Sequence, residues 1–232
     1  MNNKICNKKL IAFVLGWMII FSGIVFSEDF ILNRSSVNGF DRIIMNPYSK
    51  SLDYLGTGLT ITTMLTPAVM LAAPVQDYWK IGVEYAETAV ISFGVNEIVK
   101  RCINRPRPYM YFEGAPQSEI EDGDCNNSFY SRHTALAFTG AGFTTFMICQ
   151  YFPDSKWKIP VIAASFSLAT ASGVMRIASG NHFLTDVLVG AVVGTGFGFL
   201  VPWINSFWLK PSINGNIQMN ASPVGLNFCI RF

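Results

Sequence analysis

Long apolar runs separated by short polar segments dominate the chain. They cover residues 10–26, 54–75, 82–99, 134–152, 159–174 and 183–204. Runs of this length are typical of helices that cross the roughly 30 Å hydrocarbon core of a bilayer. The pattern therefore predicts an all-α fold, a six-helix transmembrane bundle.

The third run is the least typical, because it contains Glu84, Glu87 and Glu97. A charged side chain near the bilayer centre costs about 2.5–3.5 kcal/mol on insertion scales. We therefore expect these glutamates to face the bundle interior or to lie near a helix end. The core of a soluble helical protein is the alternative for this run.

The sixth run carries glycine at every fourth position, at Gly190, Gly194 and Gly198. Residues four apart lie on one face of a helix, and small residues at this spacing form a groove that a second helix can approach closely. The sequence therefore predicts tight packing of another helix against this face.

The pattern divides the chain into four parts. The first contains Lys4, Lys8 and Lys9, which we expect on the cytoplasmic side, followed by an apolar run that resembles a signal peptide or a retained helix. The expected parts are a signal-like anchor or first transmembrane helix at 1–27, an external segment at 28–53, a helical core at 54–209 and a tail at 210–232. Within the tail, the loose alternation of apolar and polar residues at 224–232 suggests a strand.

Composition agrees with a membrane protein. Half of the 232 residues are hydrophobic, and only 14% are charged. The formal net charge of +2 argues against nucleic acid as a partner. The five cysteines form no CxxC pair, so we expect no metal site, whereas Cys102 and Cys125 could form a disulfide in an oxidising compartment or remain unpaired thiols.

The alternation of spans brings two polar stretches to one side. With the amino terminus inside, the loops after the first, third and fifth spans lie outside. Residues 100–133 and 176–182 then share the membrane–water interface on the outer side, where we expect the active site.

The first of these stretches begins with KRCINRPRP, directly after the third span. Positive clusters that flank a membrane span are expected on the cytoplasmic side. Because this cluster falls on the outer side, a functional role is favoured. Lys100 and Arg107 can offer a point charge and a bidentate fork to a phosphate. Arg101 and Arg105 could serve a neighbouring anionic lipid or the same substrate.

Two histidines, the complete set in this chain, stand beside arginines at the outer ends of spans. Ser131 is a plausible N-cap of the fourth span, and His133 in its first turn could protonate a leaving oxygen. His182 and Asp186 are four residues apart, so in a helix they share a face and the carboxylate could orient the imidazole. A salt bridge between Arg176 and Asp186 is the structural alternative.

These residues resemble the three signature motifs of the type 2 phosphatidic acid phosphatase superfamily. Lys100 with Arg107-Pro108 matches the first motif, and Ser131 and His133 match two positions of the second. The third motif is matched by three residues, Arg176, His182 and Asp186.

The resemblance implies a phosphatase without metal or other cofactor. His182 would attack phosphorus and form a phosphohistidine, Asp186 would hold its tautomer, and His133 would protonate the leaving group. The implied phosphate ligands are Lys100, Arg107, Ser131, Arg132 and Arg176.

Two of the three departures from the family pattern affect the chemistry of the site. Arg132 replaces a glycine, and its guanidinium could add an anion contact that favours a diphosphate or a phosphorylated glycolipid as substrate. Met175 replaces a serine and removes one hydrogen-bond donor.

The sequence thus predicts a multi-pass phosphatase of a bacterial inner membrane that removes phosphate from a lipid monoester or diphosphate outside the cytoplasm. A soluble secreted acid phosphatase and a vanadate-dependent oxidase are enzymatic alternatives. An inactive relative that binds or transports lipid is the alternative of another class.

Overall fold

The structure is a computed structural model that describes residues 31–72, 78–208, 218–222 and 225–229. The chain divides into two units, Met1–Ile31 and Leu32–Phe232. The first apolar run, expected to be an anchor or a first transmembrane helix, lies outside the described residues.

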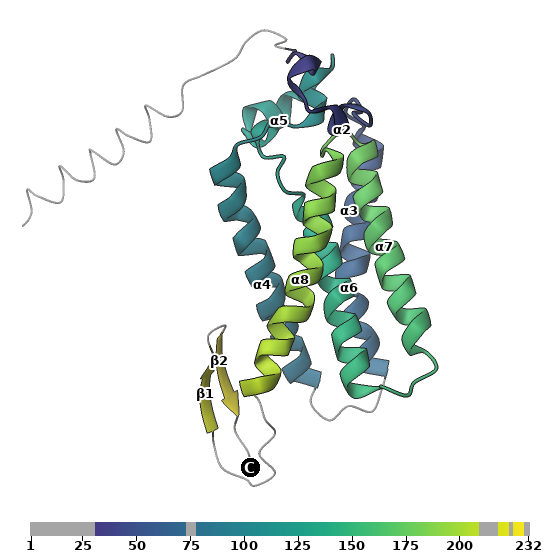
Figure 1. Ribbon diagram of the computed structural model, residues 1–232, viewed down its shortest axis with the longest axis vertical. Helices are drawn as coiled ribbons and strands as arrows, with labels where there is room; N and C mark the ends of the chain where they lie inside the picture. The colour runs from purple at the N-terminus through teal and green to yellow at the C-terminus, as the bar shows by residue number, and fades with distance from the viewer. Residues whose placement is uncertain (1–30, 73–77, 209–217, 223–224, 230–232) are drawn as a thin grey trace, which may run out of the picture. The chain divides into compact units, whose positions relative to one another are not determined.

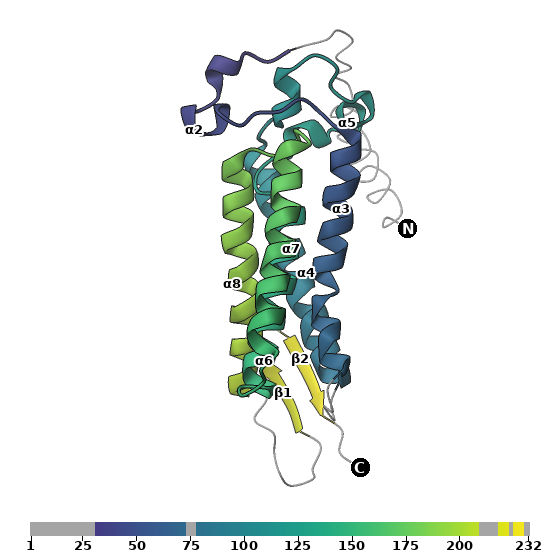
Figure 2. The same cartoon turned by 90° about the vertical axis from the view of Figure 1, so that its right-hand side faces the viewer.

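Each of the other five apolar runs forms a helix in the described residues. Their bounds are α3 Lys50–Met64 with its continuation η2 Thr66–Ala72, α4 Tyr78–Ile103, α6 Arg132–Tyr151, α7 Lys158–Ala178 and α8 Leu184–Trp208. Figures 1 and 2 show these helices side by side. The helical reading of the apolar pattern is confirmed for this part of the chain.

Three of these helices have the length and composition to cross a membrane. They are Lys50–Ala72, Lys158–Ala178 and Leu184–Phe207. Helix α4 carries charged residues, and α6 is the most enclosed of the helices, with Ala137, Ala141 and Phe143 fully buried. The structure supports a bundle with membrane-spanning helices, and the count of six spans stays a prediction.

Helix α6 contacts α3, α4, α7 and α8. The glycine face of α8 packs on it, because a Cβ atom added at Gly194 would lie 2.1 Å from the carbonyl oxygen of Ala135. A Cβ at Gly198 would lie 2.7 Å from the carbonyl oxygen of Thr139. The tight helix packing predicted from the glycine spacing is confirmed.

Short elements gather at the end of the bundle where α8 begins (Figure 2). They are η1 Arg34–Ser36, α2 Gly39–Arg42, η3 Pro108–Tyr111, α5 Gln117–Glu121 and η4 Asp124–Asn126. An apolar cluster of Val37, Tyr111 and Phe183 joins them to the start of α8. Part of the segment expected to be external thus packs on the core.

The described part of the tail forms an antiparallel hairpin. Strand β1 Gln218–Ser222 pairs with β2 Gly225–Cys229, with Asn220 opposite Asn227. The strand predicted at 224–232 is confirmed by β2.

Candidate active site

The sequence-predicted site residues meet at one end of the bundle. Helices α4 and α7 end there, and α6 and α8 begin there (Figure 1). Most of these side chains are less than a tenth exposed: Lys100, Arg107, Ser131, Arg176, His182 and Asp186. Two polar stretches far apart in sequence therefore form one buried cluster.

His182 occupies the loop between α7 and α8. The preceding turn requires glycine at Gly180, which has φ +74° and packs so closely on the Asn46 and Pro47 carbonyl oxygens that a Cβ would lie 2.6 Å from each. The Nδ1 atom of His182 lies 2.8 Å from the backbone oxygen of Ser128. Because a carbonyl oxygen only accepts hydrogen bonds, Nδ1 carries the proton and Nε2 keeps its lone pair.

Positive charge surrounds the His182 ring. Burial, followed by the charges of Arg107, Lys100 and Arg176, lowers the pKa of His182 well below its ordinary value of 6.5. The imidazole is therefore neutral at pH 7, and its unprotonated Nε2 is a competent nucleophile. The same three cations could bind an anion beside it.

Asp186 does not make the direct hydrogen bond to His182 that the four-residue spacing suggested. Its Oδ2 atom lies 3.9 Å from the histidine Nδ1. That oxygen instead accepts the hydroxyl of Ser128 at 2.5 Å and the backbone N–H of Phe183 at 2.9 Å. The carboxylate thus caps its own helix and holds the residue whose carbonyl orients His182.

Arg176 reaches from the last turn of α7 to α3. Its Nη2 donates to the carboxylate of Asp53, and its Nη1 donates to the hydroxyl of Thr57 at 3.0 Å. The expected alternative, a salt bridge with Asp186, is not among the ion pairs of the described residues. The buried Nε has no hydrogen-bond partner among those residues and is a free donor for an anion.

Arg107 is fixed by the loop that follows α5. Its Nη2 pairs with the carboxylate of Asp124, and its Nη1 donates to the side chain of Asn181 at 2.9 Å. Burial alone would raise the pKa of Asp124, but the charges of Arg107 and Lys100 lower it below the ordinary value. Asn181 in turn donates to Asp53 at 3.0 Å, so one polar network holds Arg107 and Arg176.

Ser131 is the N-cap of α6, as predicted. Its hydroxyl oxygen accepts the backbone N–H of Thr134 at 3.4 Å, and its own N–H donates to the backbone oxygen of Asp186 at 3.1 Å. His133 follows in the first turn, close enough to Arg176 and His182 for their charges to act on its imidazole. The amino terminus of a long helix and a second imidazole therefore border the cluster.

Arg132, the residue that replaces the family glycine, has a partner on the neighbouring helix. Its Nη1 donates to the carboxylate of Glu97 at 2.6 Å, and its Cζ lies 5.5 Å from the ring centre of Phe93. Each side chain of the ion pair is about one third exposed. Arg132 is thus tied to α4, and an anion contact with its guanidinium would compete with Glu97.

Several polar residues of this cluster were not singled out from the sequence. They are Asp41, Asp53, Asp124, Ser128 and Asn181. Ser128 and Asn181 lie only a few residues before His133 and His182, so their position was a usable signal. Asp41 in α2 and Asp53 in α3 lie far from the motifs in sequence, whereas Asp124 lies within the polar stretch 100–133. No motif spacing points to these three residues.

Among the described residues, Cys102, Cys125 and Cys149 are free thiols, so the possible disulfide between Cys102 and Cys125 is not formed. The described residues contain no group of three or more His, Cys, Asp or Glu side chains arranged to hold a metal ion.

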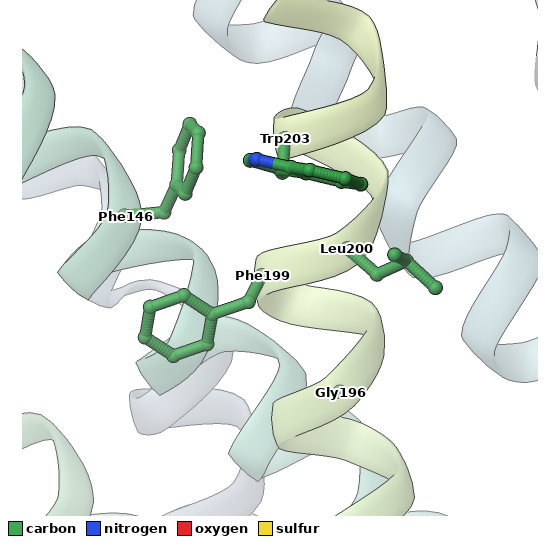
Figure 3. Close-up of a pocket in the computed structure, with 5 residues that line it drawn as sticks. All are labelled: Phe146, Gly196, Phe199, Leu200 and Trp203. Atoms are coloured by element: carbon green, nitrogen blue, oxygen red, sulfur yellow. The ribbon is translucent and has the colours of Figure 1, made fainter.

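An apolar hollow elsewhere on the bundle is a different feature. Figure 3 shows Phe146 of α6 facing Phe199 and Trp203 of α8, and Gly196 and Leu200 complete the lining. Because this lining offers no ionisable side chain, it cannot hold a phosphate. The polar cluster at the other end remains the candidate active site.

Curated relatives match parts of the chain. It is 33% identical over 104 residues to lipid A 1-phosphatase of Porphyromonas gingivalis, covering 45% of this chain and 22% of that protein. It is 32% identical over 133 residues to the bacitracin transport permease protein BcrC of Bacillus licheniformis, covering 56% and 58%. The chain therefore spans less than two thirds of either relative.

Two solved structures also align. One is a transmembrane PAP2-type phosphatidylglycerolphosphate phosphatase of Bacillus subtilis, at 21% identity and TM-score 0.41, covering 70% of this chain and 90% of that chain. The other is LpxE of Aquifex aeolicus, at 22% identity and TM-score 0.44, covering 70% and 92%.

A family model also matches this chain. It is described as the PAP2 superfamily and matches residues 81–210, which is more than half of this chain and includes every predicted site residue. The resemblance seen in the three motifs is thereby confirmed, and the chain belongs to the PAP2 superfamily.

Proposed function

We propose that this protein is a metal-independent phosphatase that hydrolyses the phosphate head group of a membrane lipid through a phosphohistidine at His182. One observation carries the proposal. The neutral ring of His182 is oriented by the Ser128 carbonyl oxygen at 2.8 Å and is surrounded by Lys100, Arg107 and Arg176. A buried nucleophile beside convergent cations suits attack on phosphorus.

In the first step Nε2 of His182 forms a bond to phosphorus as the bond to the leaving oxygen breaks. The negative charge of the bound phosphate favours the protonated form of His133, which donates its proton to that oxygen. Lys100, Arg107 and Arg176 neutralise the equatorial oxygens, and the Ser131 hydroxyl and the amide of Arg132 add hydrogen bonds. Asp186, held near His182, stabilises the positive charge that the ring gains.

In the second step water replaces the histidine. His133, now neutral, takes a proton from the attacking water, whose oxygen bonds to phosphorus as the bond to Nε2 breaks. Inorganic phosphate leaves, and His182 returns to its neutral form. One histidine thus acts first as an acid and then as a base.

A lipid substrate is supported by the apolar helices that end at the site. It is also supported by the relative named lipid A 1-phosphatase. We infer a phosphomonoester or a diphosphate, with phosphatidic acid, a polyprenyl diphosphate, phosphatidylglycerophosphate and lipid A as the substrates to compare. We place the protein in a bacterial inner membrane with the site facing outward, because the basic residues before the first apolar run favour the inside.

The test is phosphate release from those four lipids in detergent and excess chelator, by wild type and by His182→Ala. The proposal predicts chelator-resistant release from at least one lipid and a loss of at least roughly 10⁴-fold in the variant. Folded wild type that releases phosphate from none of the lipids would refute it. Carbonate washing separates the soluble alternative, since an integral protein stays with the membrane fraction.

A further inference from the structure

Asp41 is a buried carboxylate in a segment without a predicted chemical role. It lies in α2, is 1% exposed, and accepts hydrogen bonds from the Asn38 amide at 2.7 Å, the Thr185 backbone N–H at 2.9 Å and the Thr185 hydroxyl at 2.7 Å. Burial would raise the pKa of Asp41, but hydrogen bonds from Thr185, Arg105 and Asn38 lower it below its ordinary value. Asp41 is therefore ionised at pH 7.

Arg105 joins Asp41 to the active-site carboxylate. Its Nη2 donates to Asp41 at 2.7 Å, and its Nη1 donates to Asp186 at 2.5 Å. The guanidinium also stacks 4.2 Å from the ring centre of Phe183. Both carboxylates are fully buried, and the arginine side chain is 22% exposed. This geometry leaves Arg105 committed to the two aspartates rather than to an anionic lipid or substrate.

Asp186 is the link between this cluster and His182. It accepts the Ser128 hydroxyl at 2.5 Å, while the Ser128 carbonyl oxygen lies 2.8 Å from the histidine Nδ1. Its own Oδ2 atom is 3.9 Å from that nitrogen. A change in the charge of this cluster will therefore change the electrostatic potential at the imidazole.

The cluster holds two carboxylates and one guanidinium, so its formal charge is negative. Without Asp41, the charge of Arg105 would cancel that of Asp186, and this cluster would no longer offset the positive charge around His182. His182 becomes positively charged when it bonds to phosphorus, and a buried charge of that kind needs a nearby negative one.

We propose that Asp41 is a positioning residue that holds Arg105 and balances its charge, so that Asp186 stays negative towards His182 during phosphoryl transfer. The inference rests on the proposed function, since it concerns the charge that the nucleophile gains. It assigns the segment before the second apolar run a role in turnover rather than in substrate binding.

The test compares Asp41→Asn with the double variant Asp41→Asn/Arg105→Gln. The single variant removes one negative charge, and we expect kcat to fall by roughly tenfold or more with KM nearly unchanged. The double variant restores the formal charge of the cluster, and kcat should recover to within about threefold of wild type. Asp154→Asn, an exposed aspartate in the loop between α6 and α7, is the matched control.

A double variant as slow as the single one or slower would overturn the inference, because a purely structural role predicts additive damage. An unchanged kcat in Asp41→Asn would also overturn it. If the single variant does not purify as a monodisperse protein, the kcat of the double variant is the test. Charge balance predicts that the double variant folds and turns over substrate. Wild type and His182→Ala, assayed alongside, test the proposed function separately.

Discussion

The Nδ1 atom of His182 lies 2.8 Å from the backbone oxygen of Ser128, and the hydroxyl of the same serine donates to Asp186 at 2.5 Å. One residue thus orients the nucleophile with its main chain and holds the acidic residue with its side chain. The expected His–Asp pair is connected through a third residue.

Replacing Ser128 with alanine separates these two contacts. The carbonyl oxygen remains, so the tautomer of His182 should persist, but Asp186 loses a short hydrogen bond in a buried site. We expect kcat to fall by about tenfold with little change in KM. Steady-state kinetics of Ser128→Ala beside Ser118→Ala, an exposed serine of α5, measures this, and equal kcat values for the two variants would contradict it.

We expect the Arg132–Glu97 ion pair to limit how freely the arginine can contact a substrate. Glu97→Gln removes the competing charge, so the ratio of diphosphate to monophosphate hydrolysis should rise. Arg132→Gly should lower that ratio and should make a further Glu97→Gln change ineffective. The measurement is kcat/KM on polyprenyl diphosphate and monophosphate of equal chain length.

Glu113→Gln, at an exposed position, is the control for the loss of an acidic charge. If Arg132→Gly and Glu97→Gln both leave the ratio of the two substrates unchanged, Arg132 has no part in substrate choice.

Two glycines of α8 offer a matched test of helix packing. A Cβ at Gly194 would lie 2.1 Å from the Ala135 carbonyl oxygen, whereas a Cβ at Gly196 would meet nothing within 4 Å. Gly194→Ala should therefore destabilise the fold by about 1–3 kcal/mol, and Gly196→Ala should be neutral or stabilising. Thermal unfolding in detergent, followed by tryptophan fluorescence, should show a lower Tm for the first variant alone.

The pH dependence of the free enzyme follows from the burial of His182. Burial and neighbouring cations hold its pKa well below 6.5, so the folded protein keeps this ring neutral where an unfolded chain would protonate it. The stability that this histidine contributes is present above pH 6.5 and is lost as the pH falls below it.

For activity, the acid limb of kcat/KM that belongs to His182 should lie below pH 6.5. The measurement is a pH–rate profile from which the separately determined ionisation of the substrate phosphate has been subtracted. An acid limb centred at or above 6.5 would show that the ring is not shielded as described.

The sequence predicted the parts of the fold that depend on period and composition. Apolar runs located the helices, the spacing of Gly190, Gly194 and Gly198 identified a packing face, and Ser131 marked the start of α6. These features are local, so a single sequence carries them.

The contacts within the site could not be predicted in the same way. Asp53 and Asp41 reach Arg176 and Arg105 from segments 123 and 64 residues away, and no spacing rule links such pairs. Asp186 makes no direct hydrogen bond to His182, because it has nearer donors in Ser128 and Phe183. Helical spacing shows which residues share a face, but it does not determine the hydrogen-bond partner of a side chain.

The most direct measurement is the search for phosphate bound to His182 during turnover. Wild type mixed with labelled lipid substrate and chelator, quenched under alkaline conditions and digested, should yield a phosphorylated peptide that contains this histidine. The label on this peptide should disappear when excess unlabelled substrate is added before the quench, and His182→Ala should give no labelled peptide. Turnover at full rate in His182→Ala, or label found only on another residue in wild type, would contradict a phosphohistidine at this position.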